Sequence, residues 1–113
     1  MNQDVYWTAN VKRVALSILA QSQRDGATEV VFASATAAAG ASLRYKVDDT
    51  WYCWAGPPAE MLSDLVTMLA WLARADEESF PKAGIIDVPY SGLPLKWAIW
   101  MASPNSECVL TPV

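Results

Sequence analysis

Histidine is absent from this 113-residue chain, and its absence excludes several kinds of chemistry. Without an imidazole, neither a Ser-His-Asp triad nor a Cys-His pair can be assembled. Histidine-ligated metal sites and a histidine pH switch are excluded as well. The sequence also lacks the glycine-rich loop with Lys-Ser or Lys-Thr that cradles nucleotide phosphates. We therefore expect that the protein is not an enzyme, has no catalytic residues and uses no cofactor.

Cysteine is scarce, since only Cys53 and Cys108 are present. Two cysteines are too few for a zinc ribbon, and they lie far apart in the sequence. We predict that both are reduced thiols buried in the core. The acidic residues 48–49 and 76–78 lack the spacing of a calcium-binding loop, so no metal site is expected.

Long hydrophobic runs and excess positive charge are also missing. The longest apolar stretch, residues 65–73, is interrupted by Thr67 and is shorter than the ~18 residues of a membrane span. The amino terminus has no basic region before an apolar run, so we expect a cytoplasmic protein without membrane insertion. The net charge of −4 and the pI of about 4.5 argue against nucleic-acid binding.

The residues that are present indicate one globular domain over residues 1–113, with 53% hydrophobic and 18% charged residues. Apolar residues at helical spacing predict a helix over 10–24, capped by Thr8 or Asn10 and ended by Gly26, and a second helix over 59–74. Alternating patterns predict strands over 29–33, 42–47, 50–54, 85–88, 93–101 and 107–111, with residues 34–41 as a loop. The order of helix, three strands, helix and three strands predicts an α+β fold with the helices packed on an antiparallel sheet.

Several short motifs follow one another along this chain. They are Gly26-Ala27-Thr28-Glu29-Val30-Val31, Leu43-Arg44-Tyr45-Lys46-Val47-Asp48-Asp49, Pro81-Lys82-Ala83-Gly84-Ile85, Gly92-Leu93-Pro94-Leu95-Lys96-Trp97-Ala98-Ile99 and Ser106-Glu107. Their succession resembles the PAS-like domain that precedes the motor domain in type II secretion ATPases and in type IV pilus assembly and retraction ATPases. The resemblance implies a PAS-like fold and a role in secretion, pilus function or its regulation.

In that family the PAS-like domain lends arginines to nucleotide bound by the motor domain. Arg44 matches the first of these positions, whereas Lys46 replaces the second and Ala98 stands where a later strand carries an arginine. Lysine keeps the charge but loses the planar bidentate geometry of a guanidinium. The resemblance therefore implies a non-catalytic domain whose partner is a protein, such as a separate motor ATPase, or a second copy of the chain.

Six tryptophans are many for one small core. In the strand over 93–101, Trp97 alternates with Trp100, and in the strand over 50–54, Tyr52 and Trp54 alternate with Trp51, so both faces of the sheet carry aromatic residues. Helices on both faces, an apolar ligand pocket and a protein interface each explain this pattern. Aromatic residues are enriched at binding hot spots, and we predict an interaction surface. Its expected residues are Tyr52, Trp54, Trp97 and Trp100.

Arg44, Lys46 and Lys96 form a second candidate site, a basic strip on the sheet. Such a strip suits a phosphate or an acidic partner, although alternating charges are also typical of a solvated sheet face. Three functions follow from these features. The first is a protein-interaction module. The alternatives are a PAS-like sensor of a small molecule and an accessory subunit whose basic residues complete a nucleotide site on a motor protein.

Overall fold

The computed structural model describes residues 2–33, 43–54, 59–75, 79–103 and 106–113. It confirms the α+β fold and the predicted order of elements. Two helices and six strands follow one another as α1 (Asn2–Arg24), β1 (Glu29–Phe32), β2 (Leu43–Val47), β3 (Thr50–Cys53), α2 (Ala59–Leu72), β4 (Lys82–Tyr90), β5 (Leu93–Met101) and β6 (Cys108–Pro112). The predicted loop over 34–41 lies outside the described residues.

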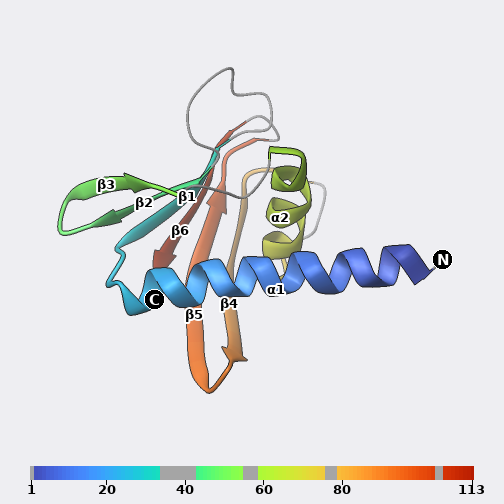
Figure 1. The fold of residues 1–113 in the computed structure, drawn as a ribbon. Helices are drawn as coiled ribbons and strands as arrows, with labels where there is room; N and C mark the ends of the chain where they lie inside the picture. Colours follow the sequence, from blue (N-terminus) through green and yellow to red (C-terminus); the bar gives the residue numbers. More distant parts are fainter. Residues whose placement is uncertain (1, 34–42, 55–58, 76–78, 104–105) are drawn as a thin grey trace.

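The strands form one antiparallel sheet in the order β3-β2-β1-β6-β5-β4. The first and last strands of the chain therefore meet at the centre of the sheet. Both helices lie on the same face of the sheet, and α1 crosses the strands (Figure 1). We call this face the inner face and the opposite one the outer face. Within the described part of the chain, no helix is long and apolar enough to cross a membrane.

Helix α1 ends where the sequence predicts, because Gly26 adopts a left-handed φ of 77° and the Ala27 N–H donates to the Ser22 carbonyl at 2.9 Å. Its predicted start is wrong, since the helix begins at Asn2 rather than near residue 10. No proline or glycine interrupts residues 2–25, so the helix continues through Thr8 and Asn10. Both expected caps lie inside the helix as exposed residues, where their polar side chains are tolerated.

Two-residue turns close the β2–β3 hairpin and the β4–β5 hairpin. Asp48 and Asp49 have φ values of 50° and 64°, and Ser91 and Gly92 have values of 50° and 79°. Positive φ at both central residues is the type I′ geometry that matches the twist of paired strands. The prediction of β4 was too short, because the strand pairs with β5 from Lys82 to Tyr90.

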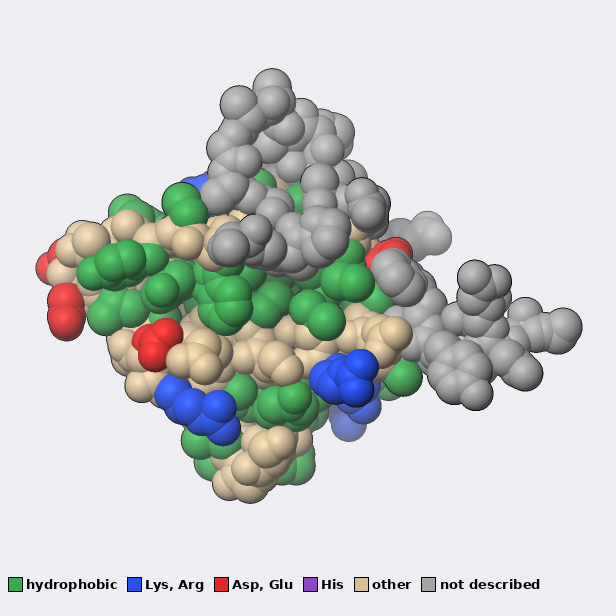
Figure 2. Space-filling model, viewed as in Figure 1, with side chains coloured by type: hydrophobic (Ala, Val, Ile, Leu, Met, Phe, Trp, Pro, Cys, Tyr) green, Lys and Arg blue, Asp and Glu red, His purple; other side chains and the backbone are tan. Residues whose placement is uncertain are grey.

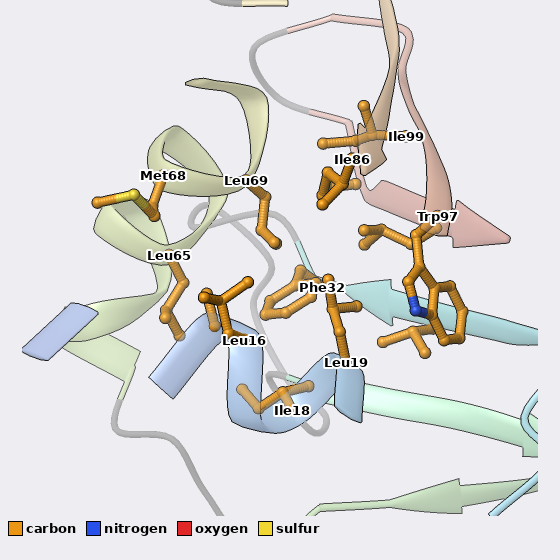
Figure 3. Close-up of a cluster of buried hydrophobic side chains, with 14 of the residues drawn as sticks. Leu16, Ile18, Leu19, Phe32, Leu65, Met68, Leu69, Ile86, Trp97 and Ile99 are labelled. Atoms are coloured by element: carbon orange, nitrogen blue, oxygen red, sulfur yellow. The ribbon is translucent and has the colours of Figure 1, made fainter. Parts of the chain in front are cut away.

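The core fills the space between the inner face and the helices. Figure 3 shows Leu16, Ile18 and Leu19 from α1 and Leu65, Met68 and Leu69 from α2 gathered against Phe32, Ile86, Trp97 and Ile99 of the sheet. Polar contacts add to this packing. The Trp97 Nε1 donates to the Gln23 side-chain oxygen at 3.2 Å, and the Tyr90 and Ser17 hydroxyls lie 2.8 Å apart. Helix α1 is thereby held on β5 and β4.

Candidate functional site

Trp97 does not belong to any surface. Its exposed fraction is 0%, because it points from the middle of β5 into the core, beneath α1. Its indole N–H is used by Gln23 of α1. The prediction that Trp97 takes part in an interaction surface is therefore wrong. Alternation along β5 was correctly inferred, but the face that carries Trp97 is the one that the helices cover.

Tyr52 and Trp54 lie with Tyr45 in a second aromatic group on the inner side of the β2–β3 hairpin. The rings of Tyr45 and Tyr52 are stacked with their centroids 5.5 Å apart, and the Trp54 ring meets Tyr45 edge-on at 5.9 Å. Figure 2 shows hydrophobic side chains over this hairpin, beside α1. Trp100 lies on the outer face. The predicted surface residues thus belong to two different faces.

Two exposed tryptophans, Trp100 and Trp51, lie on the outer face, whereas the exposed Trp71 lies on α2. One row of paired residues crosses all six strands and consists of Ala83, Trp100, Val109, Val31, Arg44 and Cys53. Trp100 is 49% exposed, Ile85 on β4 is 52% exposed, and Trp51 on β3 is 42% exposed. Four strand spacings separate Trp51 from Trp100, or about 19 Å. The outer face is therefore a mixed surface, on which exposed apolar side chains stand among charged residues such as Arg44, Lys46 and Lys96.

One ion pair lies within this surface. Arg44 on β2 donates from both terminal nitrogens to the two Glu107 carboxylate oxygens, at 2.7 and 3.2 Å. The paired hydrogen bonds hold the pKa of the Glu107 carboxyl below its ordinary value and raise the pKa of Arg44. The bidentate pair uses two of the five N–H donors of the Arg44 guanidinium and offsets its positive charge, which weakens its attraction for a phosphate. The geometry thus gives little support to the nucleotide-site alternative.

The predicted basic strip is divided in the structure. Arg44 and Lys46 both lie over the ring of Trp51, at 5.1 and 5.8 Å from its centroid. Lys46 is also 3.8 Å from Asp49. Lys96 stands on β5 beside Asp87 of β4, three strand spacings or about 14 Å from β2. The three cations share the outer face, but they do not converge on one site.

Sequence reasoning missed Trp51 and Ile85, and it misplaced Cys53. Trp51 shares a face with Arg44 and Lys46 by simple alternation, but the sequence carries no signal that this face is the one opposite the helices. Cys53 was expected in the core and is exposed, because it lies in the short edge strand β3. Cys108 is buried as predicted, and burial raises the pKa of its thiol to about 12.

The structure also bears on a ligand pocket. Large, fully buried side chains occupy the space between the inner face and the helices, among them Trp97, Phe32, Leu19, Leu65 and Leu69. A shallow cleft does lie between the end of α2 and the start of β4, lined by Arg74, Ala75, Ser79, Pro81, Lys82 and Ala83. Its lining is polar and open to solvent, which does not suit the apolar ligand expected of a sensor. Among the described residues, no cluster of acidic or cysteine side chains is arranged to hold a metal ion.

Neither a protein-family model nor a curated protein matches this chain. The candidate site is therefore defined by its own geometry, which is a sheet face bearing the exposed residues Trp100, Ile85 and Trp51 around the ion pair of Arg44 and Glu107.

Proposed function

We propose that this protein is a non-catalytic interaction and regulatory module that docks on a partner protein through the outer face of its sheet. The observation that carries the proposal is the exposure of Trp100 and Trp51 on the face opposite both helices. Tryptophan and arginine are the residues most enriched at binding hot spots, and the outer face combines both.

The charges of the outer face favour a protein partner. Arg44 is paired with Glu107, and Lys46 lies near Asp49, so the cations are largely compensated within the domain. A nucleic acid would need uncompensated positive charge, which a net charge of −4 does not provide. A protein surface would instead bury the tryptophans together with the Arg44–Glu107 pair that lies between them, whose charges already compensate each other.

The class of partner comes from the sequence resemblance. Because the ordered motifs are similar to the PAS-like domain of secretion and pilus ATPases, we propose a motor ATPase of that kind as the partner. In this proposal the domain regulates or positions the motor and contributes no chemistry. The ion pair with Glu107 offsets the charge of Arg44, which supports a docking role over a direct contact with nucleotide.

A quantitative pull-down tests the proposal. Purified domain is used as bait in lysate of the source cells, and any motor ATPase that it retains is then purified and titrated against the domain. Trp100→Ala should weaken binding about tenfold or more, as removal of a hot-spot tryptophan does. Trp71→Ala is the matched control, because Trp71 is 57% exposed on α2 and should leave binding unchanged. Equal binding by the Trp100→Ala variant and the wild type would refute docking through the outer face.

A further inference from the structure

We draw no further inference here: the strongest candidate, the partly exposed aromatic group of Tyr45, Tyr52 and Trp54 on the inner side of the β2–β3 hairpin, is an apolar surface patch, and nothing in the described part of the chain shows what covers it.

Discussion

Replacement of Gly84 by alanine should destabilise the domain strongly, because the end of α2 packs directly on this glycine. A Cβ atom at position 84 would clash with the carbonyl oxygen of Ala73 and lie 3.1 Å from the Ala73 Cβ. The carbonyl cannot easily rotate away. It precedes a tight turn in which Arg74 has a φ of 57° and the Ala75 N–H donates to the Ala70 carbonyl at 2.8 Å.

The size of the effect follows from this rigidity. Overpacking a well-packed site costs about 1–3 kcal/mol, and a backbone clash belongs at the upper end of that range. Domains of this size have a free energy of unfolding of about 5–15 kcal/mol, and 1 kcal/mol corresponds to a change of roughly 4–8 °C in Tm. Gly84→Ala should therefore lower the Tm by about 10–20 °C. Urea denaturation followed by circular dichroism and a thermal scan measure both quantities.

A second substitution tests the mechanism. Adding Ala73→Gly to Gly84→Ala removes the Ala73 Cβ but leaves its carbonyl oxygen in place, so stability should not recover. Gly92→Ala is a control in which the strain has a different cause. No atom lies within 4 Å of the Cβ that alanine would add, and only the φ of 79° is unfavourable for alanine. It should cost about 1 kcal/mol. The reasoning is refuted if Gly84→Ala unfolds like the wild type, or if Ala73→Gly restores its stability.

Three further outcomes are expected. Trp97→Ala should lower the free energy of unfolding, measured by urea denaturation, by about 3–5 kcal/mol, because a fully buried side chain is lost. A decrease below about 1 kcal/mol would contradict the described core. Since Arg44 lowers the folded-state pKa of Glu107, their pair stabilises the fold above about pH 4.5, and this contribution is lost as the pH falls through the lower, folded-state value. Glu107→Gln should remove that part of the acid sensitivity. It should lower the free energy of unfolding at neutral pH by less than about 1 kcal/mol, because both side chains are partly exposed. An unchanged pH profile of unfolding would disprove the assignment. A thiol reagent should modify Cys53 in the native protein and Cys108 only after unfolding, so rapid labelling of a Cys53→Ser variant would show that Cys108 is not buried.

Local pattern was sufficient to predict the types and order of the elements. The alternation of Leu95, Trp97 and Ile99 with Lys96 and Trp100 identified β5 and divided its side chains between two faces, because strand geometry has a period of two. Helical spacing and Gly26 likewise located the end of α1. Signals of this kind depend only on neighbouring residues, so they can be interpreted without knowledge of the rest of the chain. The start of α1 was not predicted, since a cap is only a local preference within a helix that nothing interrupts.

Tertiary structure alone decided which face the helices cover, and therefore whether each strand tryptophan is buried or exposed. Trp97 and Trp100 are three residues apart and equally aromatic, yet one is fully buried and the other half-exposed. The sequence determined that they point to opposite faces, whereas the packing of α1 and α2 determined which face meets solvent. The pairing of Arg44 with Glu107, 63 residues away, depends on β1 lying between β2 and β6. Strand order reflects how the whole core is buried, and no local pattern contains it.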